Sequence, residues 1–205
     1  MIRRAGRRIE HANCMHNVLL SLQSFNEAYD RLPPPVCKDK KGRPLFSWRF
    51  QIMPFLAAWM ERMELDESWQ SPGNDRWVKH RNYWYCWTDP GSPDELETNV
   101  VAITGPGTAF DEDHPTRLKD IPPSTILCVE IAHSGIHWMA PGDLQLGKLP
   151  PSLARGLDGR GFHVGCADGT VWFVTADVPL SEIEKLCTIE GAKKYDREKV
   201  LGFKH

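Results

Sequence analysis

Histidine and cysteine side chains near the amino terminus are the first residues whose spacing could support chemistry. His11, Cys14 and His16 form an H-x-x-C-x-H pattern. On a helix, His11 and Cys14 share a face and could bind a soft metal ion, but His16 points well away from His11. Because a structural zinc ion normally takes four ligands, the pattern favours a buried or exposed face of a helix over a metal site.

A second pair of histidines, His133 and His137, lies four residues apart. Gly135 between them favours a loop, and no H-E-x-x-H pattern supports a metalloprotease site. Ser134 follows His133 directly, but the chain has no G-x-S-x-G motif for a hydrolase nucleophile. The glycine-rich segment 105–108 lacks the lysine and the following helix of a phosphate loop, so a tight turn is favoured.

Acidic side chains gather in two segments rich in turn-forming residues. The first contains Asp89, Asp94, Glu95 and Glu97, and the second contains Asp111, Glu112 and Asp113. Oxygen-rich loops can bind calcium, but this spacing matches no defined calcium site. Solvated loop charge is the default interpretation, and a loop calcium is the alternative. We therefore assign no catalytic, cofactor-binding or metal-binding residue from the sequence.

The composition excludes several classes of protein. Hydrophobic residues make up 41% and charged residues 25% of 205 residues, which predicts a folded core rather than global disorder. The net charge of −2 argues against a general affinity for nucleic acid or anionic lipid. No run of 18 apolar residues predicts a membrane span. Six cysteines lie far apart without a C-x-x-C pair, which leaves disulfide pairing and redox compartment open.

The elements that must position these residues begin with one long helix, expected over residues 3–30. Its apolar seam recurs at spacings of three and four residues, at His11, Met15, Val18, Leu22, Phe25 and Tyr29. Pro33, Pro34 and Pro35 end it. Further helices are expected at 48–63, capped by Ser47 and kinked at Pro54, at 71–80, and at 182–188, capped by Ser181.

Strands are expected at 83–87, 99–104, 125–131, 161–167 and 170–175. Residues 36–44 are interpreted as an exposed turn, and the tail 191–205 as polar and loose. Cys128 and Cys166 fall in strands and are expected to be buried as small hydrophobic residues. One long helix, small helices and then antiparallel strands are typical of an α+β fold. We expect one domain, with a helix over 1–32, a globular head over 33–190 and the tail 191–205.

The last two strands are predicted to form a β-hairpin with Asp168-Gly169 as a two-residue type I′ turn. That register pairs Cys166 with Val171, Val164 with Phe173 and Phe162 with Thr175, which makes one side of the ribbon apolar. The long first helix is expected to pack on this apolar side. His163 lies on the other side without a visible partner and is interpreted as a packed or surface residue.

Several segments in order carry a family resemblance from about Arg7 to Gly191. They include Tyr29-Asp30-Arg31-Leu32-Pro33-Pro34, Leu45-Phe46-Ser47-Trp48-Arg49, Thr98-Asn99-Val100-Val101-Ala102-Ile103, Ser124-Thr125-Ile126-Leu127 with Glu130, and the hairpin 161–173. With these segments the chain resembles the bacterial pseudopilin-like proteins of domain-of-unknown-function family 1559. These are also described as prepilin-type, processing-associated H-X9-DG proteins.

The resemblance implies a pseudopilin-like fold, in which a long amino-terminal helix lies on a small antiparallel sheet. Family members usually carry an apolar anchor helix just upstream of the Arg-rich start. It would hold them in the inner membrane and in a pilus-like shaft. No such anchor is in this sequence. His11 and Cys14 replace the family's usual Cys and Asn, and Asp158 replaces the His of H-X9-DG, while Asp168-Gly169 is retained.

The first functional hypothesis is a non-enzymatic structural or assembly protein of a type II secretion or type IV pilus-like system. It would act by association with other proteins, including a second copy of itself through the amino-terminal helix. The alternative is a soluble binding or adaptor module without an anchor, and a remote alternative is a metal-dependent hydrolase. With an upstream anchor we expect the periplasmic side of the cell envelope. Otherwise we expect a soluble protein of undefined compartment.

Overall fold

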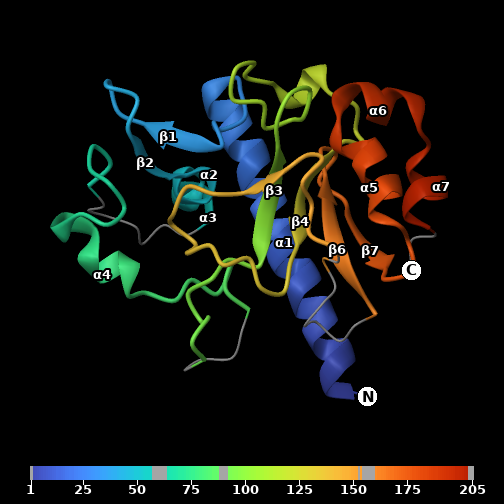
Figure 1. Cartoon of the computed structure of the whole chain (residues 1–205), viewed down its shortest axis with the longest axis horizontal. Helices are drawn as coiled ribbons and strands as arrows, with labels where there is room; N and C mark the ends of the chain where they lie inside the picture. Colours follow the sequence, from blue (N-terminus) through green and yellow to red (C-terminus); the bar gives the residue numbers. More distant parts are fainter. Residues whose placement is uncertain (1, 57–63, 88–91, 152, 154–159, 203–205) are drawn as a thin grey trace.

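The computed structural model describes residues 2–56, 64–87, 92–151, 153 and 160–202 (Figure 1). Its helices are α1 (Ile2–Tyr29), α2 (Trp48–Gln51), α3 (Met53–Leu56), η1 (Pro72–Asn74), α4 (Asp75–Val78), η2 (Leu118–Asp120), α5 (Leu180–Cys187), α6 (Ile189–Lys194) and α7 (Arg197–Leu201). Its strands are β1 (Val36–Lys38), β2 (Pro44–Ser47), β3 (Val100–Thr104), β4 (Ile126–Glu130), β5 (Leu144–Gln145), β6 (Gly161–Cys166) and β7 (Val171–Thr175). The predicted α+β class is confirmed.

The main sheet has five strands in the order β5-β3-β4-β6-β7. Neighbouring strands are antiparallel, except that β5 pairs in parallel with β3. A separate antiparallel pair, β1 and β2, lies beside the start of α2. The sheet is therefore mainly antiparallel, as the sequence predicts, with β5 added at its edge.

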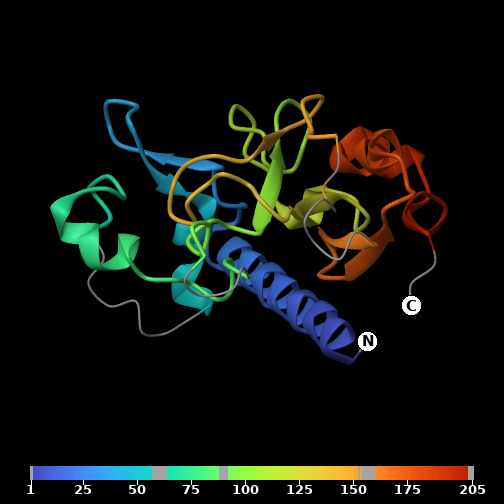
Figure 2. The same ribbon diagram turned by 60° about the horizontal axis from the view of Figure 1, so that its bottom comes forward.

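Both faces of the main sheet are covered. Helix α1 crosses behind the sheet in Figure 1, and the view in Figure 2 separates it from helices α5 to α7 at the carboxyl-terminal end. Alternating strand residues divide between two cores, because successive side chains of a strand point to opposite faces. Met15, Val18, Leu19 and Leu22 pack with Val100, Ala102 and Cys128. Ile183, Leu186, Val200 and Leu201 pack with Phe162, Val164, Trp172 and Val174.

The predicted packing of the first helix against the closing hairpin is confirmed, but the face is wrong. Leu19 of α1 lies against Gly165 of β6, whereas Phe162 and Val164 face the core beneath α5 to α7. A glycine lets the helix approach the sheet closely, because no side chain stands between the two backbones. The helix therefore lies on the side of the ribbon that carries His163 and Gly165 rather than on the side that carries Phe162 and Val164.

The hairpin register differs from the prediction by one residue. Phe162 pairs with Val174 and Val164 with Trp172. The connection has three residues, since the Cys166 amide donates to the Thr170 carbonyl at 3.0 Å. Gly169 alone takes a positive φ, +80°, within this connection. This is a three-residue loop with a left-handed glycine rather than a type I′ turn, and one residue of slip exchanges the two faces.

Other differences have local causes. Residues 83–87 form no strand, because the amides of Tyr85 and Cys86 both donate to the Asn82 carbonyl and close a turn. The segment 36–44, predicted as an exposed turn, contains β1, and its last residue begins β2. The helix predicted at 48–63 is broken at Ile52 into α2 and α3, and residues 57–63 lie outside the described part.

The predicted caps and the loose tail also need correction. Ser47 precedes α2, but its hydroxyl donates to the Trp138 carbonyl and caps nothing. Helix α5 begins at Leu180 after Pro179, so Ser181 is not its cap. Residues 189–201 form α6 and α7, whose Val200 and Leu201 are buried in the second core. The tail is therefore part of the folded body up to Leu201.

Candidate functional site

A buried carboxylate between two imidazoles joins the first helix to the sheet. Glu130, at the end of β4, is 2% exposed, and its Oε1 lies 2.7 Å from Nδ1 of His11 on α1. Its Oε2 lies 2.5 Å from Nδ1 of His163 on β6 and also accepts the backbone N–H of His163 at 2.8 Å. His163 is 5% exposed. Three elements thus meet at one acidic side chain.

The electrostatics of this cluster favour an ionised carboxylate. Burial alone raises the pKa of a carboxyl group, but the hydrogen bonds from His11 and His163 overcome that effect and lower the pKa of Glu130 to about 2. Because an ionised carboxylate only accepts hydrogen bonds, Nδ1 of both imidazoles carries a proton. Both oxygens of Glu130 are therefore satisfied, as a buried charge requires.

Aromatic rings hold the two imidazoles in place. The His11 ring stacks on Trp87 at a centroid distance of 4.4 Å, and the His163 ring meets the edge of Phe173 at 5.2 Å. The Arg8 guanidinium lies 5.1 Å from the centroid of the same Phe173 ring. We assign the cluster to fastening α1 on the sheet, since every polar atom of Glu130 is used within the protein.

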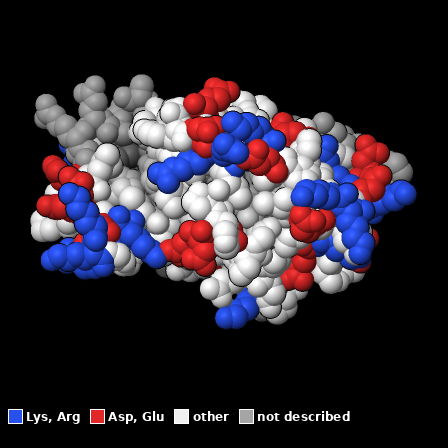
Figure 3. All heavy atoms as spheres, turned by 90° about the horizontal axis from the view of Figure 1, so that it is seen from above, with Lys and Arg blue, Asp and Glu red and all other residues white. Residues whose placement is uncertain are grey.

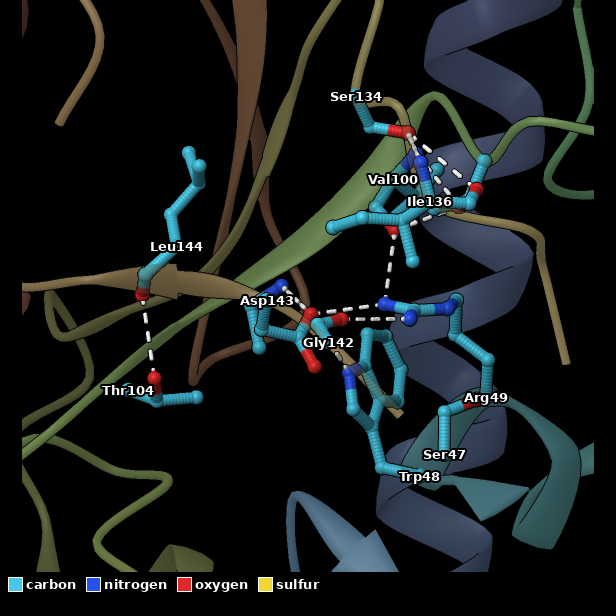
Figure 4. Close-up of polar contacts among 12 residues, drawn as sticks. Ser47, Trp48, Arg49, Val100, Thr104, Ser134, Ile136, Gly142, Asp143 and Leu144 are labelled. Carbon is cyan, nitrogen blue, oxygen red and sulfur yellow. Dashed lines mark hydrogen bonds and ion pairs between the residues drawn. The ribbon is translucent and has the colours of Figure 1, made fainter. Parts of the chain in front are cut away.

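A second buried charge pair fixes the segment after β2 (Figure 4). Arg49 of α2 is fully buried, and its Nη1 donates to Asp143 Oδ1 at 2.7 Å. The same oxygen accepts the Trp48 indole N–H and the Ala102 backbone N–H. The rest of the guanidinium donates to backbone carbonyls, including Gly142 at 2.8 Å. This pair connects α2, β3 and the segment before β5.

The three side chains of the H-x-x-C-x-H pattern, His11, Cys14 and His16, point to different partners in the structure. His11 binds Glu130, whereas the Cys14 thiol donates toward the Tyr83 carbonyl and His16 contacts the Gly169 carbonyl. Of the two interpretations of His163, packed or surface, the structure supports the packed one, and it supplies the partner that the sequence did not reveal, Glu130. Asp158, the position of the family's histidine, lies outside the described residues.

The second histidine pair is also divided. His137 Nε2 lies 2.9 Å from the Val78 carbonyl, while His133 Nδ1 lies 2.7 Å from Asp94 Oδ2. The Ser134 hydroxyl contacts only the backbone of Ile136 in the described part (Figure 4). No described contact makes Ser134 part of a nucleophile–base pair.

The two acidic loops differ. In the second loop, Asp111 accepts the backbone N–H groups of Gly107 and Asp113, and Glu112 pairs with Lys38. The predicted tight turn at 105–108 is present, because the Thr108 amide donates to the Gly105 carbonyl.

In the first loop, the structure brings Asp94 and Glu97 together with His133, with one ligand atom from each within 4.8 Å of the others. Asp89 lies outside the described residues. Sequence reasoning noted both segments but not their convergence.

The outward side of α1 carries exposed apolar side chains. Ile9 is 64% and Leu20 44% exposed, and both lie away from the buried Met15 and Leu19. In Figures 1 and 2 the amino-terminal end of α1 extends beyond the sheet. Among the described residues, no helix combines the length and apolar character needed to cross a bilayer.

Charges of both signs are mixed over the surface. On the face seen in Figure 3, lysines and arginines lie next to aspartates and glutamates, without a continuous patch of one sign. Exposed pairs such as Lys119 with Asp30 and Arg117 with Asp120 illustrate this mixing. That face therefore lacks the single-sign field by which proteins attract nucleic acid.

All six cysteines are free thiols, and five of them are buried. The predicted burial of Cys128 and Cys166 in strands is confirmed. Burial raises the pKa of the Cys166 thiol to about 11 and that of Cys86 to about 12, so both thiols are protonated at neutral pH.

Comparison with models of protein families shows to which family the chain belongs. The model of a protein family of unknown function, DUF1559, matches residues 1–124. The chain belongs to the DUF1559 family. The match covers α1, the β1–β2 pair, α2 to α4 and β3, and so includes His11, Arg49 and Asp94. No curated protein and no solved structure matches this DUF1559 protein.

Proposed function

We propose that this DUF1559 protein is a non-enzymatic, pseudopilin-like assembly protein of a type II secretion or type IV pilus-like system. It acts by association of α1 with helices of partner proteins or of a second copy. The observation that carries the proposal is the division of α1 into a fastened side and an exposed side. The fastened side is held by Glu130 and packed on Gly165.

The exposed side has the spacing of a helix–helix contact. Ile9, Asn13, His16 and Leu20 follow one another at intervals of four, three and four residues, and all four are exposed. Residues at these intervals form one stripe along a helix. The stripe has an apolar residue at each end and uncharged or weakly basic residues between them. Such a stripe is better suited to packing against an apolar surface of a partner protein than to exposure to water.

The fastened side supports the same function. A helix that transmits an assembly contact must not detach from its head. The buried Glu130 cluster and the Leu19–Gly165 contact hold α1 at two points along its length. The mixed surface charge in Figure 3 is consistent with a protein partner rather than a polyanion.

Site-specific photo-crosslinking in the native host tests the proposal. The photoreactive residue benzoylphenylalanine replaces Leu20 on the exposed stripe. In a matched control it replaces Leu65, which is 59% exposed and lies outside α1. We expect position 20, and not position 65, to give a discrete adduct. Mass spectrometry should identify that adduct as a prepilin-type protein or a second copy.

Two outcomes would overturn the proposal. One is the absence of a discrete adduct when benzoylphenylalanine replaces Ile9, Asn13 and Leu20 in three separate variants, each of which is expressed and folded. The other is an adduct at position 20 with a protein that has no prepilin-type helix, which would favour a binding or adaptor module instead.

A further inference from the structure

Two carboxylates and one imidazole converge where the loop after β4 meets the turn that precedes β3. Asp94 and Glu97 come from one turn, closed by the Glu97 amide donating to the Asp94 carbonyl at 3.0 Å. His133 comes from the loop that follows β4. One ligand atom of each residue lies within 4.8 Å of the others. Their donor atoms are therefore close enough to share a single ion.

The backbone holds these two segments in register. Glu97 and His137 form an isolated antiparallel bridge, and the Thr98 amide donates to the Ile136 carbonyl at 2.8 Å. The Trp138 amide donates to the Leu96 carbonyl at 3.1 Å. A site built on paired backbone loses little conformational freedom when it binds a ligand.

Hydrogen bonds also orient the side chains of this cluster. The Gly135 amide donates to Glu97 Oε2 at 3.0 Å, and His133 Nδ1 lies 2.7 Å from Asp94 Oδ2. Within the described ranges no lysine or arginine forms an ion pair with Glu97. The cluster therefore places two carboxylates beside one imidazole.

The donor set indicates the class of ion. Calcium and magnesium take oxygen ligands, whereas an imidazole nitrogen with carboxylate oxygens suits zinc and other first-row divalent ions. Three protein ligands leave a coordination position for water or for a group from another molecule. We propose that Asp94, Glu97 and His133 bind one divalent transition-metal ion at the surface of the head, with zinc as its representative.

Metal titration of the whole protein tests this site. The protein is first dialysed against a chelator. Zinc binding is then followed by calorimetry, and cobalt binding by its visible absorption. His133→Gln and Glu97→Gln each remove one ligand. The matched control is His114→Gln, because His114 is an exposed histidine 3.2 Å from Asp111 in the other acidic loop.

We expect the unaltered protein and His114→Gln to bind one more equivalent of zinc than His133→Gln does. If the number of equivalents is the same, we expect these two proteins to bind zinc at least tenfold more tightly than His133→Gln. Glu97→Gln should show the same loss, and a tenfold excess of calcium should not displace the zinc. Equal zinc binding by all four proteins would overturn the inference. So would an equal loss in His114→Gln, or displacement of zinc by calcium. Circular dichroism of each variant checks that the fold is retained.

Discussion

Leu19 of α1 lies so close to Gly165 of β6 that a Cβ built on the glycine would lie 2.9 Å from Leu19 Cδ2. The Cys128 sulfur would lie 3.0 Å from the same Cβ. This contact sets the distance between the helix and the sheet. The crowding arises from packing rather than from backbone strain, since Gly165 has no positive φ.

The first prediction is that Gly165→Val lowers the free energy of unfolding by about 1–3 kcal/mol, because added methyl groups overpack the contact with Leu19. Urea denaturation measures the change. In a double-mutant cycle, Leu19→Ala should recover about 1 kcal/mol or more of this loss by making room. An unchanged urea midpoint for Gly165→Val would mean that the helix does not lie on this face.

The second prediction concerns Glu130→Gln, which removes the charge that both imidazoles face. The substitution replaces the buried carboxylate between the two imidazoles by a neutral amide. We expect this loss of charge to lower the free energy of unfolding by about 3 kcal/mol at pH 7. The pKa of Glu130 is lowered from 4.5 to about 2 in the folded protein. Its stabilising contribution is therefore complete above pH 4.5 and is lost as the pH falls toward 2.

Urea midpoints of Glu130→Gln and the unaltered protein should differ at pH 5 and converge as the pH falls from 4.5 to 2. Glu10→Gln serves as the control, since Glu10 lies on the same helix and is exposed. It should leave the midpoint unchanged at every pH. A difference that persists undiminished at pH 2.5 would contradict the role of Glu130 as an ionised anchor.

Helices and strands were predictable from the sequence where apolar residues recur at a regular spacing over a long segment. The seam from His11 to Tyr29 predicted α1, and β-branched runs predicted β3 and β4, because repeated apolar spacing reports which face is buried. The strand predicted at 83–87 was wrong. Its aromatic residues favour strands, but the Asn82 carbonyl accepts two backbone amides and closes a turn there. A polar composition hid α6 and α7, whose few buried residues give a weak signal.

The candidate sites were less predictable than the fold. Glu130 lies 119 residues from His11 and 33 from His163, so no local spacing reveals their contact. One sequence signal was present, namely a lone acid within the apolar segment 126–132. A buried acid requires partners, but the sequence does not say which ones. The convergence of Asp94 with His133 likewise depends on backbone pairing between two loops.

The third prediction is that Arg49→Lys lowers the free energy of unfolding by about 2–4 kcal/mol even though the positive charge is kept. Arg49 donates at once to Asp143 Oδ1 and to the Gly142 and Trp138 carbonyls, and an ammonium group cannot reproduce that fork. Chemical denaturation measures the loss. Arg43→Lys, in the exposed Arg43–Asp39 pair, should leave the midpoint unchanged. Equal effects of the two substitutions would show that the guanidinium geometry is unimportant.

The last prediction tests the three-residue hairpin connection. Gly169 takes φ +80°, and a Cβ at this position would lie 2.8 Å from Gln23 Nε2 of α1. Gly169→Val should therefore lower the free energy of unfolding by about 1–3 kcal/mol, through backbone strain and this contact.

Asp168→Gly gives a second measurement, because Asp168 lacks a positive φ and its carboxylate accepts hydrogen bonds from Thr170 and Arg197. A type I′ turn would gain from glycine at this position, whereas the observed connection should lose stability when these bonds are removed. An increase in the urea midpoint of Asp168→Gly would favour the two-residue turn and with it the opposite assignment of faces. A decrease, together with a decrease for Gly169→Val, agrees with α1 lying against Gly165.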